Sequence, residues 1–313
     1  MQAPPSTAPE PRAWSATLVA ALACALLPAC NVERFAVGKL GNALAEGGET
    51  WMQDDDPELI RSAAPFSLKL VESLLSKDPE HDGLLLAAAS GFTQYAWGFV
   101  QQDAERMEAV DLARSRELAE RARKLYHRAR EYGLRGLDAR HPGFRETLLE
   151  DPATAIVDAE RADVPFLYWT AAAWGLELSL SKTDPMALAD LPAVQALIDR
   201  ALELDEGWNG GAIHGFLILF EETRPGGGRD WTERSKQHYE RAVELSKGRR
   251  AAPHVAFAEA VPMKKQDKAG FVQLLDAALA IDSTQYPEVR LENELAQARA
   301  RWLASRVDEL FVE

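Results

Sequence analysis

Histidines are the side chains in this sequence best suited to hold a metal ion or transfer a proton near neutral pH. They stand at positions 81, 127, 141, 214, 238 and 254, and no two of them are four residues apart, the spacing at which two imidazoles of one helix hold zinc. His214 with Glu221 or Glu222 comes nearest to a ligand pair, but offsets of seven and eight residues put the partners two helical turns apart. We therefore expect no metal site, and a capping or core hydrogen bond for His214.

Patterns that carry nucleophilic or phosphate chemistry are also missing from the sequence. There is no Gly-x-Ser-x-Gly motif, and the run Gly226-Gly227-Gly228 lacks the Lys-Ser/Thr pair of a phosphate-binding loop. Carboxylates are abundant, but on amphipathic helices they usually form a solvated face. The sequence therefore predicts no catalytic residue, no cofactor and no enzymatic activity.

Aromatic residues gather in two predicted helices, at positions 92–99 and 166–174, and residues 164–176 carry no charge over 13 positions. Glu177 follows at once, so this second segment is too short to span a membrane and is expected to be buried. The rings have two interpretations, as core or as the lining of an apolar cavity, since Tyr and Trp combine an apolar ring with a polar group. For a cavity we expect a lining of Tyr95, Trp97, Tyr168, Trp169 and Trp174, with His214 and Arg224 as polar contacts.

Length and charge limit the classes of function. The 313 residues can bury one large core or two ordinary ones, and 35 Lys+Arg against 49 Asp+Glu give a net charge of -14. No cluster of five or more basic residues interrupts this acidic balance, which would repel phosphate backbones. We expect no nucleic-acid partner.

The N-terminal residues resemble a bacterial lipoprotein leader. After Arg12, an uncharged stretch of 17 residues (13–29) ends in Leu27-Pro28-Ala29-Cys30, where a small residue before the cysteine suits cleavage and the thiol suits lipidation. We therefore expect a signal peptide over residues 1–29, lipidation of Cys30 and a lipid-anchored segment over residues 30–56. Pro28 and the long Pro-rich start depart from the usual pattern, so an unprocessed N-terminal anchor and a later start codon stay open as alternatives.

The rest of the chain has a helical period. From Pro65, the apolar residues Phe66, Leu70, Leu74 and Leu75 recur at helical spacing. Predicted helices rich in Ala and Leu end at Asp78, Asp138, Asp205, Ser246 and Asp282. The last two intervals, 41 and 36 residues, are close to the about 34 of tetratricopeptide helix pairs.

Earlier intervals of 60 and 67 residues leave room for inserted helices, and alternating strand patterns are missing. The sequence thus predicts an all-α fold, a tetratricopeptide-like helical-repeat solenoid with inserted helices and a concave face, as a single domain over residues 57–313.

A set of short segments resembles the T component associated with TRAP (tripartite ATP-independent periplasmic) transporters. The segments, in the same order and spacing, are 95–102 (YAWGFVQQ), 126–135 (YHRAREYGLR), 141–144 (HPGF), 163–165 with 168–175, 201–205 (ALELD), 211–214 (GAIH) and 224–228 (RPGGG). The likeness extends from about residue 30 to residue 311. Trp97 departs from it, because a smaller Tyr or Phe is common at that place.

The resemblance implies a lipid-anchored periplasmic protein that pairs with the TRAP solute-binding subunit, as an adaptor and not an enzyme. It also implies self-association, a trimer included, around an apolar channel. An apolar or carboxylated organic ligand would then be held or passed on. The alternative is an envelope scaffold that binds another protein and has no small-molecule ligand.

Overall fold

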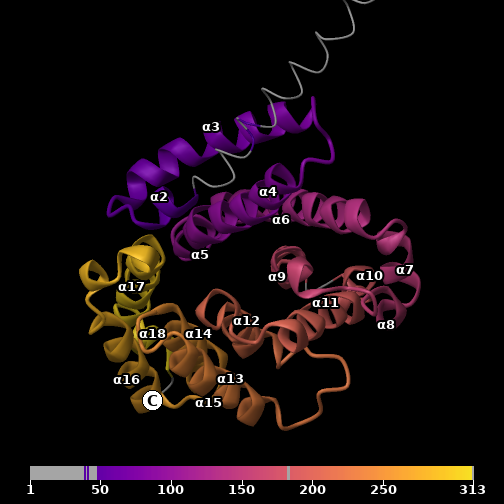
Figure 1. Cartoon of the computed structure of the whole chain (residues 1–313). Coiled ribbons are helices and arrows are strands. Elements are labelled where there is room, and N and C mark those ends of the chain that lie inside the picture. Colours follow the sequence, from indigo (N-terminus) through magenta and orange to yellow (C-terminus); the bar gives the residue numbers. More distant parts are fainter. Residues whose placement is uncertain (1–38, 40, 42–47, 182–183, 312–313) are drawn as a thin grey trace, which may run out of the picture.

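In the structure, a computed structural model, residues 39, 41, 48–181 and 184–311 are described (Figure 1). The predicted signal peptide over residues 1–29 and the predicted lipidation site Cys30 lie outside them. Within the described ranges all regular structure is helical, which confirms the all-α prediction. No helix in these ranges is both long and apolar enough to cross a membrane.

The first part of the chain folds into long helices. They are α2 (Gly48–Met52), α3 (Pro57–Leu75), α4 (Asp82–Tyr95), the π-helical turn η1 (Ala96–Gln101), α5 (Gln102–Met107), α6 (Leu112–Arg140), α7 (Phe144–Glu150), α8 (Pro152–Ala155), η2 (Arg161–Asp163), α9 (Val164–Ser179), α10 (Pro185–Leu188) and α11 (Leu191–Leu204). Aspartates set several starts: the Oδ1 of Asp56 accepts the amides of Glu58 and Leu59 at α3, and Asp111 caps α6 in the same way.

The second part consists of shorter helices. They are η3 (Trp208–Gly210), α12 (Ala212–Phe220), α13 (Trp231–Leu245), α14 (Ala252–Ala260), α15 (Pro262–Lys265), α16 (Lys268–Leu279), η4 (Ser283–Gln285), η5 (Pro287–Val289), α17 (Arg290–Ala304) and α18 (Val307–Leu310). The predicted ends at Asp205 and Ser246 are confirmed, because α11 and α13 stop one residue before them.

Helix α3 differs from the sequence prediction. It begins at Pro57, so Pro65 lies inside it, and Phe66 is 75% exposed instead of buried. The buried face is Ile60, Ala64, Leu68, Val71 and Leu75 with Leu74. Of the apolar residues that recur at helical spacing, Leu74 and Leu75 are therefore buried and Phe66 is not, because α4 packs on the side of α3 that carries the buried stripe.

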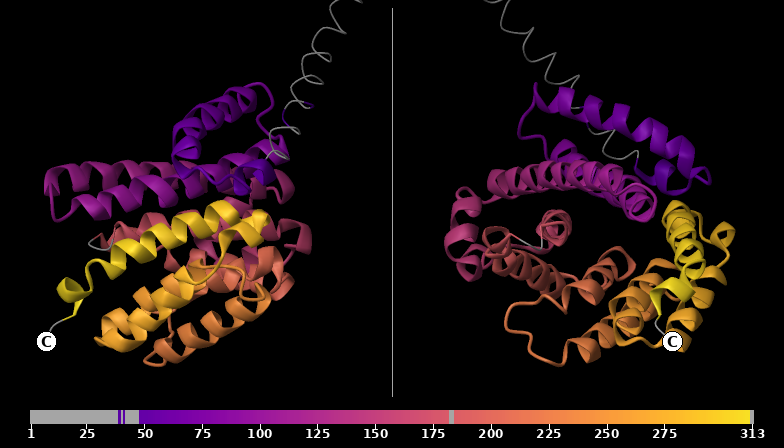
Figure 2. Two further views of the ribbon diagram at one scale, coloured as in Figure 1. Left: turned by 90° about the vertical axis from the view of Figure 1, so that its left-hand side faces the viewer. Right: turned by 180° about the vertical axis from the view of Figure 1, so that it is seen from behind.

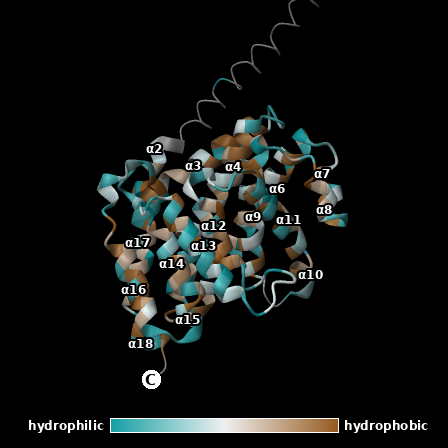
Figure 3. Ribbon diagram, turned by 60° about the horizontal axis from the view of Figure 1, so that its bottom comes forward, coloured by the Kyte–Doolittle hydropathy of each residue, from teal (hydrophilic) through white to brown (hydrophobic). Residues whose placement is uncertain are grey.

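Helices α6, α9 and α4 form the centre of the first part. Helix α9 is apolar around most of its circumference and packs against α6, α4 and α11, as a helix without a polar face must. Its approach to α6 is close: a Cβ on Gly136 would lie 2.0 Å from the Phe166 ring. Figure 3 shows α4 as predominantly hydrophobic, in line with its place under α3 and α6.

The helix chain curves until its two ends meet. Figure 1 shows α17 beside α2 and α5, and Figure 2 shows the same contact from behind. Arg290 Nη2 lies 2.8 Å from Asp55 Oδ2, and Arg299 Nη1 donates to Glu105 Oε2 over 2.7 Å. Charged side chains thus join the two ends of the described helix chain.

Candidate functional site

The seven predicted site residues fall into several separate places. Tyr168 and Trp169 lie on α9, and Trp97 lies where the two ends of the curve meet. His214 lies in the first turn of α12, and Arg224 lies in the link between α12 and α13. Tyr95 and Trp174 are 9% and 1% exposed and pack in the core. The structure thus brings only part of the set together, and one cavity lined by all seven residues is not formed.

An aromatic cluster forms around Tyr168. Its ring centroid lies 5.0 Å from that of Trp169 and 4.7 Å from that of Trp208, which comes from the link between α11 and α12. These distances are typical of favourable aromatic pairs. Burial raises the pKa of Tyr168 above its usual range, with a further contribution from the charge of Glu292. The Tyr168 hydroxyl is therefore neutral and can donate a hydrogen bond.

The core positions of Tyr95 and Trp174 are each covered by an arginine of α6. Arg121 lies over the Tyr95 ring and its Nη2 donates to the phenol oxygen over 3.3 Å. Arg130 lies 4.8 Å over the Trp174 ring. Cation–π contacts of this kind stabilise the packing of an arginine on an aromatic ring. Tyr95 therefore supports the packing of α6 on α4, and Trp174 supports the packing of α6 on α9.

Trp97 belongs to the contact that closes the curve. The guanidinium of Arg299 lies 5.4 Å over the Trp97 ring and bonds to Glu259 and Glu105. The Arg299 side chain is only 9% exposed. In the adjoining π-turn, the side-chain amide of Gln101 donates to Glu105 over 3.0 Å. A buried polar chain thus connects the first and last thirds of the protein.

His214 takes part in a histidine pair that connects α12 with α13. Its Nδ1 lies 2.8 Å from Nδ1 of His238, and its Nε2 lies 3.2 Å from Glu206 Oε1. One nitrogen of the close pair must donate and the other accept. Burial, and then the charge of His238, lower the pKa of His214. Hydrogen bonds from Arg241 and His214 lower the pKa of Glu206 to about 2.

Arg224 is held by carboxylates. It donates to Glu221 over 2.6 Å and to Asp199 over 2.8 and 2.9 Å. Burial acts to raise the pKa of Glu221, but hydrogen bonds from His238, Arg234 and Arg224 outweigh it and lower that pKa to about 2. Glu221 therefore stays ionised near neutral pH, and the guanidinium of Arg224 is already occupied by Glu221 and Asp199. Across the part of the chain that is described, no group of His, Cys, Asp and Glu is arranged to hold a metal ion.

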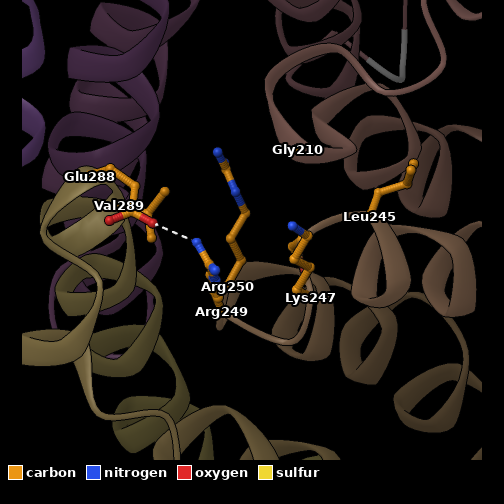
Figure 4. Close-up of a pocket in the computed structure, with 8 residues that line it drawn as sticks. Gly210, Leu245, Lys247, Arg249, Arg250, Glu288 and Val289 are labelled. Carbon is orange, nitrogen blue, oxygen red and sulfur yellow. Dashed lines mark hydrogen bonds and ion pairs between the residues drawn. The ribbon is translucent and has the colours of Figure 1, made fainter.

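A cavity of about 250 Å³ lies near the aromatic cluster (Figure 4). Its lining consists of Gly210, Leu245, Ser246, Lys247, Arg249, Arg250, Glu288 and Val289. Arg250 Nη2 donates to Asn209 Oδ1 over 2.9 Å, and Asn209 directly follows Trp208. The arrangement offers an aromatic surface and cationic side chains, which suit noncovalent binding.

The sequence prediction missed Trp208, Arg250 and Arg299. Trp208 had a local signal, since it opens the segment Trp-Asn-Gly-Gly in which Asn209, Gly210 and Gly211 all have positive φ. The other two had none, because an arginine on an amphipathic helix or in a turn is normally solvated. Only their contacts with distant parts of the chain distinguish Arg250 and Arg299 from solvated arginines.

Comparison with known proteins gives a family match and a relative for this chain. Residues 53–311 match the family described as "TRAP transporter T-component". A protein of Treponema pallidum (strain Nichols), described as an uncharacterized protein, is 29% identical over 311 residues, which covers 93% of this chain and 95% of the relative.

Proposed function

This chain belongs to the TRAP transporter T-component family, and we propose that it is a lipid-anchored periplasmic accessory protein that docks the solute-binding subunit of such a transporter. The observation that carries the proposal is the extent of the match, which covers residues 53–311 and so every helix from α3 to α18. The relative from Treponema is matched over nearly its whole length as well. The complete closed curve of helices is therefore the unit on which the function depends.

In this proposal the helix pairs act as tetratricopeptide-like units and the enclosed side of the curve receives the ligand. The aromatic cluster of Tyr168, Trp169 and Trp208 supports this part, because its rings are packed on each other yet Tyr168 and Trp169 are only partly buried. Such rings can contact an apolar or carboxylated organic ligand. Tyr95, Trp97, Trp174, His214 and Arg224 then hold the surrounding helices in place.

The lipid anchor is proposed at Cys30. The family match begins at residue 53, so the intervening residues would serve as a tether between membrane and helical domain. Metabolic labelling with an alkyne fatty acid tests this: Cys30→Ala should lose the label and leave the membrane fraction. Label retained by Cys30→Ala would contradict the anchor.

Partner capture tests the docking role. A tagged chain starting at Asn31, incubated with detergent-solubilised envelope of the native organism, should recover a TRAP solute-binding subunit in near-equal amount. Trp169→Ala should weaken this recovery or ligand binding while circular dichroism keeps its helix content. Trp174→Ala is the matched control: it should lower stability instead, by about 3–5 kcal/mol, because that ring is 1% exposed.

The second candidate function is an envelope scaffold without a small-molecule ligand. It is favoured by the arginines that already cover Trp97 and Trp174, since rings covered in this way offer little surface to a ligand. Native mass spectrometry of protein purified from its own cells separates the two functions. A co-purifying organic molecule supports the adaptor. In the partner-capture experiment, recovery of only the chain itself or of unrelated envelope proteins would favour the scaffold.

The same native mass spectrum gives the number of subunits. We propose self-association up to a trimer.

A further inference from the structure

Helix α3 carries a second apolar stripe besides the one that is buried on α4. It recurs at intervals of four, three and four residues and consists of Leu59, Ala63, Phe66 and Leu70, which we call the outer stripe. This spacing places the four side chains along one side of the helix. Leu59 is 56% exposed and Phe66 is 75% exposed, so no helix among the described residues covers them. Ala63 and Leu70 are half-buried.

The outer stripe lies on the outside of the molecule. Figures 1 and 2 show α3 on the side opposite to α13 and α15. The helix packs mainly on α4, with a smaller contact to α17. Ser62 and Ser73 are exposed on the same side of α3, and their small side chains leave the stripe open to an extended surface. Apolar side chains that are exposed side by side are unfavourable in water, which indicates a partner surface.

The neighbouring helix α6 is basic, in contrast to the chain as a whole. It carries nine Lys and Arg against four Asp and Glu, whereas the chain has a net charge of -14. Four of these cations follow one face of α6 at helical spacing and form what we call the basic row: Arg121, Lys124, Arg128 and Arg135. The first three are exposed and the last is half-buried. A local excess of positive charge on an acidic protein attracts anionic surfaces to that place.

Contacts with Glu72 of α3 place the basic row beside the outer stripe. The hydroxyl of Tyr132 on α6 donates to Glu72 over 2.9 Å, and Arg128 Nη1 lies 3.6 Å from the same carboxylate. Lys69 donates to Glu72 as well, over 2.5 Å, and lies one helical turn from Phe66. Its side chain is exposed. Lys69 therefore continues the basic row up to the edge of the outer stripe.

A lipid bilayer with anionic headgroups fits both features. Apolar side chains enter the boundary between headgroups and acyl chains, while Lys and Arg meet the lipid phosphates. The place of α3 in the chain supports this partner, because only 26 residues separate Cys30, the proposed lipid anchor, from Pro57 at the start of α3. We propose that the outer stripe and the basic row form a second contact with the anionic bilayer, in which Leu59 and Phe66 insert at headgroup level.

This contact deepens the proposed function and rests on the lipid anchor only for the nearness of the membrane. An anchor holds the chain close to the bilayer, so a surface of modest affinity is enough to keep one face on it. The contact gives the accessory protein a fixed orientation. Helices α13 and α15 then face away from the bilayer, on the side where a solute-binding subunit can approach from the periplasm (Figure 1).

Fluorescence on vesicles tests the contact. The chain starting at Asn31, which has no cysteine, is held on vesicles by an N-terminal hexahistidine tag and a nickel-chelating lipid, so the result does not depend on lipidation of Cys30. Ser62→Cys carries an NBD fluorophore beside the outer stripe. On vesicles rich in phosphatidylglycerol we expect NBD emission to rise and doxyl-labelled lipids to quench it. On phosphatidylcholine vesicles both effects should fall by at least about half, because the basic row has no anionic partner there.

Variants separate the apolar contribution to the contact. Phe66→Ser should lower the ratio of membrane-bound to unbound stripes about tenfold, because its ring no longer leaves water. Met186→Ser on α10 is the matched control, since Met186 is 80% exposed and should change nothing. A label at Gln237→Cys on α13, an exposed position on the opposite side, should keep its emission on both kinds of vesicle.

The contribution of charge has its own pair of variants. Lys69→Gln/Lys124→Gln should weaken the contact about tenfold on phosphatidylglycerol vesicles, since each cation near an anionic surface contributes to binding. Lys236→Gln/Lys265→Gln removes two exposed lysines on α13 and α15 and should leave the contact unchanged. Equal losses in both pairs would contradict the basic row as the binding element.

Three results would overturn the proposal. The first is NBD emission at position 62 that does not change on either kind of vesicle. The second is emission that is already high without vesicles, which would mean that the chain itself or a second copy covers the stripe. The third is emission that rises on addition of the solute-binding subunit in solution, which would make the stripe a protein-docking surface. Membrane contact of the tethered chain without fatty-acid labelling of Cys30 would contradict only the anchor.

Discussion

Between α3 and α11 the buried apolar side chains form one continuous cluster, whereas from α13 to α18 most of them form smaller ones, although Leu291 of α17 joins the large cluster. Helix α12 lies between the two regions: Ile213 and Leu217 join the large cluster and Ile218 joins a small one. Both regions bury polar side chains, but in the second they stand beside smaller apolar clusters, as Asn293, Gln297 and Arg299 do. The first region is thus stabilised mainly by apolar burial and the second more by specific polar pairs, which tolerate change less well.

The largest effect is expected from Arg299, the cation that connects the two regions. Replacing it by Met removes the partner of Glu259 and Glu105 and should lower the free energy of unfolding by about 3–5 kcal/mol, since a buried charge then remains unpaired. Chemical denaturation measures the loss. Arg301→Met on the same helix is exposed and should change stability by less than about 0.5 kcal/mol. Equal losses in both variants would show that the closing contact contributes nothing specific.

A smaller effect is expected from packing in the first region. Gly136→Ala would place a Cβ 2.0 Å from the Phe166 ring and should cost about 1–3 kcal/mol through overpacking, reduced by the better helix propensity of Ala. Gly215→Ala on α12 has no atom within 4 Å of the new Cβ, so it should stabilise the protein by up to about 1 kcal/mol. Thermal unfolding compares the two. A stabilising Gly136→Ala would mean that α6 and α9 can separate at little cost.

The loss of a helix cap should cost about the same stability in both regions. Asp56 caps α3 in the first region and Asp267 caps α16 in the second, each by accepting backbone amides over 2.9–3.0 Å. Replacing either by Ala should cost about 1 kcal/mol, because an exposed cap acts within its own helix. Urea denaturation of both variants measures this. A clearly larger cost in only one region would show that a cap there also supports tertiary packing.

The smallest effect is expected from mild acid, and it should be confined to α12–α14. Burial lowers the pKa of His214 and of His254, both in this part of the chain. A folded-state pKa below the unfolded value of about 6.5 means that the associated stability is present above that pH and is lost as the pH falls below it. Tyr239, whose hydroxyl can donate to the neutral Nδ1 of His254 over 3.0 Å, would then lose its acceptor.

Hydrogen exchange measures this effect at about pH 7.5 and about pH 5.5, after correction for intrinsic rates. Protection should fall in α12, α13 and α14 and remain in α6 and α9. His214→Asn, which does not titrate, should remove the part of the pH dependence that comes from the histidine pair. A uniform loss over both regions would contradict the assignment to these histidines.

The sequence predicted much of the fold, but not how the candidate site residues are arranged in space. Helix ends at Asp205 and Ser246 were correct because stop signals act over a few residues. The spacing did not indicate that Phe66 is exposed, since the side from which α4 approaches is not encoded within α3. Of the predicted lining, Tyr168 and Trp169 lie together, while Trp97, Tyr95 and Trp174 pack elsewhere. Aromatic composition indicates burial, but not which rings share a surface.

By itself, the sequence determined the helical class, the helix ends at Asp205 and Ser246, and the family, because periodicity, stop signals and short ordered segments are local properties of a chain. Only the tertiary structure decided that Arg299 meets Glu105 across 194 residues, that Trp208 completes the aromatic cluster at Tyr168, and that three links enclose a cationic cavity. These contacts join segments far apart in the sequence, so they depend on how all the intervening helices pack, and no local pattern records that packing.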